Sequence, residues 1–178
     1  DVCSSDLLDV SGRAASKGFL IAAGTTTQAE AFTSVAAHTT GSVAAIMYGD
    51  TLTYGSSTLS TSCPYVAQVG PCDVGIISVS ESGAFGWGTT IDASNGLLES
   101  VSVAAGGAGE AIAGGQYAGG LVFNPASQNQ PFSQNFEGWV AKTDPMGNWL
   151  WAVGYSTIDG GFGAQSSVLD VATDMQGN

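Results

Sequence analysis

Apolar residues recur at every second position over short runs, and Gly, Asn, Asp and Pro separate these runs along the chain. A period of two between turn-forming residues is typical of half-buried β-strands. Nowhere does the chain show a long helical period with capping residues. The pattern therefore predicts an all-β chain, with strands over residues 33–37, 43–47, 75–79, 84–88, 101–105, 111–115, 139–143, 149–153 and 169–173.

The strand pattern also repeats along the chain. Val35, Val103 and Val171 lie 68 residues apart (103 − 35 and 171 − 103), and each opens a similar segment. Residues 73–87 match residues 137–151 at an offset of 64 (137 − 73). A fixed period of this size is typical of repeat architectures, in which each unit buries its apolar face against its neighbours.

Tight turns are predicted within each repeat. Pro145 and Gly147 favour a β-turn between the strands at 139–143 and 149–153, because Pro presets φ and Gly accepts the left-handed conformation. Gly177 predicts a similar turn after the strand at 169–173. In an up-and-down chain we expect these tight turns at one end of the strands and the longer connections at the other.

Four antiparallel strands per repeat predict an incomplete β-propeller of about two and a half blades. The predicted blades cover residues 8–55, 73–123 and 137–178, and long loops at 56–72 and 124–136 join them. A β-sandwich with Greek-key connections is the alternative. It is disfavoured because sandwiches rarely repeat a whole four-strand unit.

The segment 139–152 resembles the bacterial seven-bladed β-propeller repeat (SBBP), which reads approximately aromatic-V-A-K-x-D-x-x-G-N-x-L-W-A. Residues 171–178 are similar to the second element of that repeat, V-A-V-D-x-x-G-N. The resemblance weakens toward the N-terminus, where the Lys, several Asp and the Asn are lost. It implies a propeller in a secreted or surface-attached bacterial or archaeal protein, usually without an assigned enzyme activity.

The two ends of the chain carry their own predictions. Residues 1–7, Asp-Val-Cys-Ser-Ser-Asp-Leu, read as the translation of the end of a common sequencing adapter, so we expect them to be an assembly artefact. Segment 8–178 is then the partial propeller, and we expect the chain to be cut at both ends.

Charge and cysteine usage narrow the class of partner. Three Lys or Arg stand against fifteen Asp or Glu, for a net charge of −12, which disfavours binding to nucleic acid or anionic lipid. No apolar run is long enough to span a bilayer, so no membrane insertion is expected. Cys63 and Cys72 flank a Pro-bounded loop and predict a local disulfide in an oxidising compartment, with two free thiols as the alternative.

The long connections are where a ligand is expected to bind, if one binds at all. Tyr65, Phe132 and Phe136 are the candidate contacts there; the alternative is that these loops are neutral variations in length. Trp149 and Trp151 invite a sugar-stacking interpretation. Being two residues apart, they should point to the same side of one strand, and packing between repeats explains their recurrence better.

No catalytic, metal or cofactor site is predicted. His38 is the single histidine and stands at a tight turn, without a Ser or Cys partner for catalysis. Asp144, Asp159, Asp170 and Asp174 lack the spacing of a calcium loop, and turn hydrogen bonds explain the first and last of them.

These observations predict a non-catalytic, extracellular or cell-surface β-propeller segment that serves in adhesion, display or binding of an unidentified glycan or protein ligand. One alternative is a quinone-dependent dehydrogenase propeller, since Asp144, Gly147 and Trp151 satisfy the D-x-x-G-x-x-x-W motif of that class. Another is a glycan-binding or lyase propeller.

Overall fold

The computed structural model describes residues 23–24, 31–49, 51–60, 73–93, 96–124, 130–155 and 165–174. The predicted artefact at 1–7 and the cysteines Cys63 and Cys72 lie outside these residues. The described part is all-β, as predicted. Its strands are β1 (Ala23–Gly24), β2 (Ala31–His38), β3 (Gly41–Tyr48), β4 (Thr51–Tyr54), β5 (Ser57–Ser60), β6 (Asp73–Ser80), β7 (Phe85–Asp92), β8 (Leu97–Ala105), β9 (Ala111–Asn124), β10 (Gln130–Thr143) and β11 (Trp149–Tyr155).

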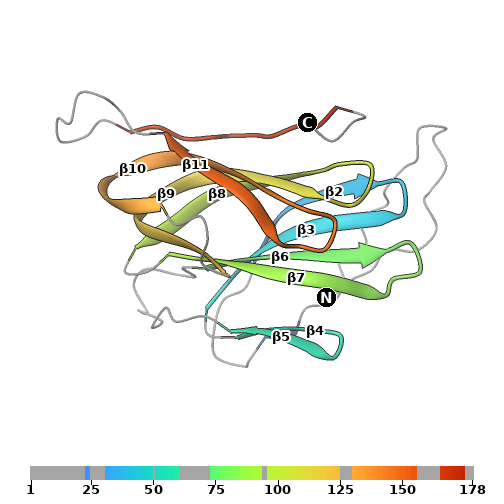
Figure 1. Ribbon diagram of the computed structural model, residues 1–178. Coiled ribbons are helices and arrows are strands. Elements are labelled where there is room, and N and C mark those ends of the chain that lie inside the picture. Colours follow the sequence, from blue (N-terminus) through green and yellow to red (C-terminus); the bar gives the residue numbers. More distant parts are fainter. Residues whose placement is uncertain are drawn as a thin grey trace.

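Eight of these strands form one curled antiparallel sheet that resembles half a barrel (Figure 1). Two four-stranded meanders make it up. The first meander is β2-β3-β6-β7, and the second meander is β8-β9-β10-β11. The long strand β9 joins them, because it pairs with β8 along its first half and with β7 through residues 122–124. The sheet therefore folds back so that the meanders lie as two layers.

The hydrogen-bonded meanders begin two strands later than the units suggested by the sequence repeat. Strand β6 pairs with β3 over eight residue pairs, although residues 49–72 separate the two strands in the chain. Closing such a connection costs little more than closing a short one, because the entropy of loop closure grows slowly with length. Each meander thus starts at the strand that contains Val35 or Val103.

The first strands of the two meanders, β2 and β8, lie side by side and contact each other at equivalent positions. The backbone N–H of Val103 donates to Ser34 Oγ at 3.1 Å. The hydroxyl of Thr39 donates to the carbonyl of Gly107 at 2.6 Å, and these two residues are 68 positions apart. Residues that contact each other between the two layers are therefore separated along the sequence by the length of one repeat.

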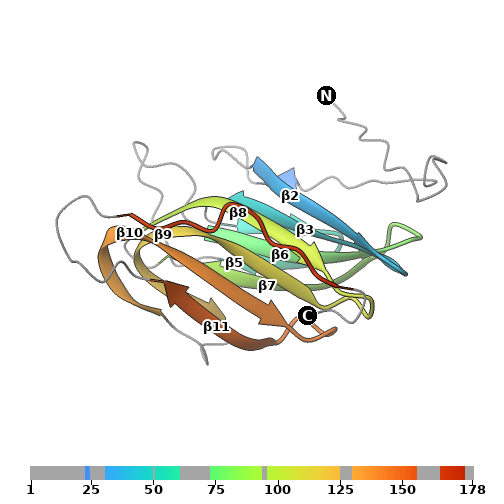
Figure 2. The same ribbon diagram turned by 90° about the horizontal axis from the view of Figure 1, so that it is seen from above.

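Residues 165–174 continue this arrangement on the other side of β8 (Figure 2). Ser102 Oγ donates to Asp170 Oδ1 at 2.6 Å, and Thr173 Oγ1 donates to the carbonyl of Ala105 at 2.7 Å, both across 68 positions. The strand predicted at 169–173 is wrong as a strand, because this segment is extended but has no ladder pairing among the described residues. Side-chain hydrogen bonds to β8 hold it instead.

The main core lies between the two meanders. Because each face of a strand takes every second residue, residues of β3 and β6 alternate between this core and the opposite face. The buried residues of the main core are Val43, Ala45, Val74, Ile76, Ile91 and Ala93 from the first meander and its end, and Leu98, Val101, Val103, Ala111, Ala113, Tyr117, Leu121, Phe123, Trp139, Ala141 and Trp149 from the second.

A second, smaller core covers the outer face of the first meander. The hairpin β4-β5, which was not predicted, packs Leu52 and Tyr54 onto Ile46, Tyr48 and Ile77 (Figure 1, bottom). The ring of Tyr54 meets the edge of Phe85 at a centroid distance of 5.6 Å. The first meander is thus buried on both faces, which explains the continuous apolar run along β3.

Both predicted long loops are shorter than expected. Strand β5 occupies residues 57–60 of the loop predicted at 56–72. Strand β10 begins at Gln130, so much of the loop predicted at 124–136 is strand paired with β9. Register shifts in that ladder accommodate a sequence without clean alternation, which is why the pattern missed it.

The expectation that Trp149 and Trp151 point to the same side is wrong. One step along β10, from Thr143 to Lys142, corresponds to two steps along β11, from Trp149 to Trp151. This β-bulge inverts the alternation between the two residues. Trp149 is 6% exposed in the main core, whereas Trp151 is 39% exposed.

Candidate functional site

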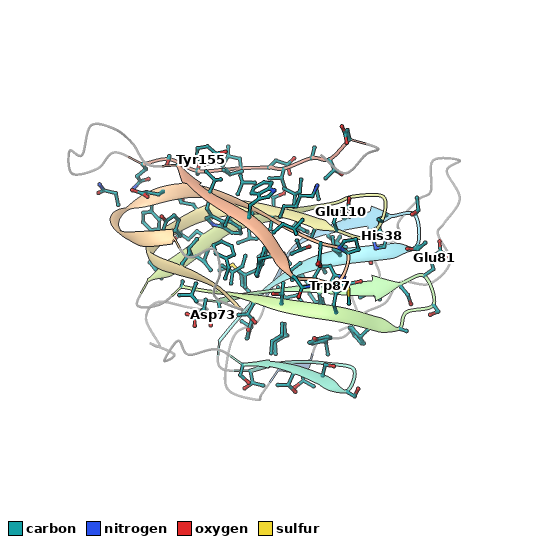
Figure 3. The ribbon with its side chains drawn as sticks, in the orientation of Figure 1. His38, Asp73, Glu81, Trp87, Glu110 and Tyr155 are labelled. Atoms are coloured by element: carbon teal, nitrogen blue, oxygen red, sulfur yellow. The ribbon has the colours of Figure 1, made fainter. Side chains whose placement is uncertain are left out.

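The two ends of the meanders differ in character. The tight turns β2-β3, β6-β7, β8-β9 and β10-β11 gather at one end, which we name the turn end. His38, Glu81 and Glu110 mark it, while Asp73 and Tyr155 lie toward the opposite end, the loop end (Figure 3). The predicted gathering of the tight turns at one end is confirmed.

The structure places only part of the predicted ligand contacts. Tyr65 lies outside the described residues, and Phe132 lies in β10 with its side chain outside the description. Phe136 is also in β10, so it is a strand residue and not a loop residue as expected. Its side chain is half-buried, and its carbonyl accepts from the backbone N–H of Ser166 at 3.1 Å.

A tyrosine faces an acid across neighbouring strands at the loop end of each meander. Tyr48 on β3 is paired in register with Asp73 on β6. Tyr117 on β9 is paired in register with Glu137 on β10. Sequence reasoning missed both pairs, because the two partners are brought together only by strand register.

The second of these pairs is internally satisfied. The hydroxyl of Tyr117 donates to Glu137 Oε2 at 3.2 Å. Burial, followed by the charge and hydrogen bond of Glu137, raises the pKa of Tyr117 to about 12. This tyrosine stays protonated and serves as a hydrogen-bond donor.

The first pair is arranged differently. The hydroxyl of Tyr48 is hydrogen-bonded to Thr90 Oγ1 at 3.2 Å. Asp73 is fully buried, and its Oδ1 accepts from the backbone N–H of Ala93 at 3.0 Å. Its Oδ2 is buried without a hydrogen-bond partner among the described residues.

Asp73 also faces a second acid. Asp92, on the neighbouring strand β7, is its direct partner in the β6-β7 ladder. Burial and then the charge of Asp92 raise the pKa of Asp73 to about 7, and the hydrogen bond from Ala93 opposes this rise. We name Asp73 and Asp92 the acid pair.

His38 is the last residue of β2 and borders the turn to β3, which agrees with the predicted turn role. Partial burial lowers its pKa, while Glu110 and Glu81 act in the opposite direction. Its Nδ1 accepts from the backbone N–H of Thr40 at 3.4 Å. No serine or cysteine is found hydrogen-bonded to it in the described part of the chain.

Two of the aspartates considered for calcium, Asp144 and Asp170, have structural roles, and Asp159 lies outside the described residues. Asp144 Oδ1 accepts from the backbone N–H groups of Met146 and Asn148 at 2.8 and 2.9 Å, which confirms its turn role. Asp170 accepts from Ser102. Across the described residues, no group of three or more His, Cys, Asp or Glu side chains is placed to hold a metal ion.

No known protein family, curated protein or solved structure matches the chain. A search of the described residues finds no helix with the length and apolar character that crossing a membrane requires.

Proposed function

We propose that this chain is a segment of a β-propeller of the SBBP type, in which each meander is one blade. The proposed role is non-catalytic: binding of an extracellular glycan or protein ligand, for adhesion or display, in a secreted or surface-attached protein. The loop end, where the chain varies most between meanders, is the proposed binding face.

The observation that carries the propeller proposal is the set of contacts at the repeat distance. In a propeller, the first strands of successive blades stand side by side around one axis, so equivalent residues face each other. The Thr39–Gly107 and Ser102–Asp170 contacts have this property, each across 68 positions. A sandwich would pair unlike strands from its two sheets instead.

The packing of Trp87 supports the same proposal. Trp87 is half-buried in the main core, and it lies against Gly147, in the turn of the next meander. Its equivalent at an offset of 64 is Trp151, on the far face of the second meander. Trp151 is 39% exposed, as expected of a face that receives a further blade.

An extended chain tests the architecture. In the extended chain, a second copy of residues 107–174 follows directly after Asp174. This copy keeps the repeat period of 68 residues, so it should form a further meander. Hydroxyl-radical footprinting should then show Trp151 of the original copy protected, because the added meander covers it. Trp139, which is fully buried already, is the internal reference. Equal reactivity of Trp151 in both chains would contradict the stacking.

An array experiment tests the binding role. The full chain is applied to glycan and extracellular-protein arrays, together with Phe136→Ala at the loop end and Met146→Ala at the turn end. We expect a ligand whose binding is weakened by Phe136→Ala and unchanged by Met146→Ala. The side chain of Met146 is 76% exposed in the wild type, so its removal should leave the fold intact. Binding weakened only by Met146→Ala would refute the loop-end assignment. Alcohol oxidation with added quinone and calcium would favour the dehydrogenase alternative.

A further inference from the structure

The acid pair is held together by the sheet itself. Asp73 and Asp92 are direct partners on adjacent antiparallel strands, and such partners stand close enough for their side chains to interact. Like charges at directly opposed positions destabilise a strand pair. Since Asp73 is fully buried and Asp92 is half-buried, water screens this repulsion less than it would at an exposed pair.

No positively charged side chain of the described residues acts on Asp73. Tyr48 faces Asp73 from β3, and Tyr54 of the hairpin lies beside Tyr48. On the other side, Asp92 pairs with Val122 of β9, and the β9 residues 121–123 are all apolar. Lys142 is the one Lys or Arg in the described part of the chain, and it pairs with Trp151 near the turn end.

A proton fits the acid pair better than a metal ion does. Calcium takes about six to eight oxygen ligands. The pair supplies two carboxylates, and no third His, Cys, Asp or Glu joins them within the described residues. A single proton between two carboxyl groups satisfies the unpartnered Oδ2 and removes the repulsion in one step.

We infer that Asp73 and Asp92 share one proton that clamps β6 to β7 at the loop end, and that losing this proton loosens this end of the first meander. No covalent bond changes: the proton passes to solvent, and the buried carboxylate of Asp73 is left facing the carboxylate of the half-buried Asp92. The inference is independent of the proposed function, because it concerns the stability of the strand pair and not a ligand.

A comparison with the second meander explains why the shared proton is proposed for the first meander alone. Glu137, at the position equivalent to Asp73, reaches the hydroxyl of Tyr117 with its longer side chain. Asp73 is one methylene shorter, and the hydroxyl of Tyr48 is engaged by Thr90. The carboxylate of Glu137 therefore accepts from a neutral side chain, whereas that of Asp73 accepts from the backbone N–H of Ala93 and faces the second acid, Asp92.

The sign of the pH dependence follows from proton binding. The folded chain keeps a proton on Asp73 up to about pH 7, whereas an unperturbed aspartate, of pKa 3.8, has lost it. The stabilisation is therefore fully present below about pH 4 and is lost as the pH rises through about 7. His38 acts in the opposite direction over part of this range, so wild type must be compared with a variant that retains His38.

The experiment compares denaturant midpoints of the full chain at about pH 5 and about pH 9. Relative to Asp73→Asn, the wild-type midpoint should fall as the pH rises. Asn keeps the shape of Asp73 and can still accept from Ala93, but it cannot lose a proton. Glu137→Gln is the matched control in the second meander, and its denaturant midpoint should fall with rising pH as much as that of the wild type does. Identical pH dependence in wild type and Asp73→Asn would overturn the inference.

Infrared spectroscopy of the unmodified chain gives a readout that does not depend on a variant folding. A protonated-carboxyl band should disappear with a midpoint near pH 7. The absence of any such band above about pH 5 would overturn the inference. The inference would also be overturned if calcium at about pH 9 stabilised the wild type but not Asp73→Asn, because the acid pair would then be a cation site.

Discussion

Gly83 and Gly147 stand at equivalent positions in the β6-β7 and β10-β11 turns, yet their surroundings differ. Both have a positive φ, 79° and 85°, which L side chains rarely adopt. A Cβ on Gly83 would meet nothing within 4 Å, whereas a Cβ on Gly147 would lie 2.5 Å from Cε3 of Trp87. Gly83 is needed for the turn alone, and Gly147 is needed for the turn and for contact between the meanders.

We predict that Gly147→Ala is more destabilising than Gly83→Ala. Gly83→Ala should cost about 1 kcal/mol of the free energy of unfolding for the strained φ. Gly147→Ala should cost about 2–4 kcal/mol, because the clash with Trp87 adds to the same strain. Urea unfolding of both variants measures the difference, and equal losses would show that Trp87 does not pack on this turn.

At the scale of elements, the hairpin β4-β5 has a defined role in the fold. It lies in the connection between β3 and β6, and it covers the face of the first meander that the second meander does not reach. Leu52 is fully buried there, while Leu59 is only partly buried. The hairpin therefore acts as a cap on a sheet face that would otherwise expose Ile46, Tyr48 and Ile77 to solvent.

We predict that Leu52→Ala costs about 2–4 kcal/mol, the usual range for a buried leucine truncated in a core. Leu59→Ala should cost less, because less apolar surface is lost from contact. In Leu52→Ala, hydrogen exchange should show that the backbone amides of β6 and β7 lose protection while those of β10 change little. Equal loss of protection in both meanders would mean that the hairpin stabilises the whole sheet and not one face.

At the scale of the whole molecule, the layers are covered unequally. The first meander lies between the hairpin and the second meander, whereas on the far face of the second meander the described part of the chain places residues 165–174 alone (Figure 2). Strand β11 therefore presents a row of exposed apolar side chains: Trp151, Val153 and Tyr155, at 39%, 45% and 52% exposure. Such a row favours association with another apolar surface.

We predict that the chain self-associates at high concentration through this row. Trp151→Ser with Val153→Thr should weaken association about tenfold or more, because an aromatic anchor contributes most to such an interface. Met146→Ser, an exposed apolar residue at the turn end, is the matched control and should leave association unchanged. Analytical ultracentrifugation across a concentration series measures this, and an unaffected double variant would place the contact elsewhere.

Local features could be predicted where neighbouring residues alone decide them. The strands around 43–47 and 75–79 form because their apolar residues fit a sheet, and Asp144 closes its turn through hydrogen bonds to residues two and four positions on. The predicted strand at 169–173 failed for a non-local reason. A strand needs a ladder partner, and the hydrogen bonds found between this segment and β8 in the described part of the chain use side chains: Ser102 donates to Asp170, and Thr173 donates to the carbonyl of Ala105.

The acid pair could not be predicted for the same reason. Asp73 and Asp92 lie 19 residues apart (92 − 73), and each reads as an ordinary polar residue at a strand end. A register shift of one residue would place them on opposite faces of the sheet. The observed β6-β7 register places the two residues opposite each other, and burial together with the charge of Asp92 raises the pKa of Asp73.

The sequence by itself determined the all-β class, the repeat distance of 68 and the positions of the tight turns, because alternation, periodicity and turn chemistry are properties of nearby residues. Only the tertiary structure decided which strands join into a meander, which tryptophan is buried and which carboxylates meet. Those outcomes depend on strand register, bulges and the packing of layers. Each of these is stabilised by contacts between residues that are far apart in the chain.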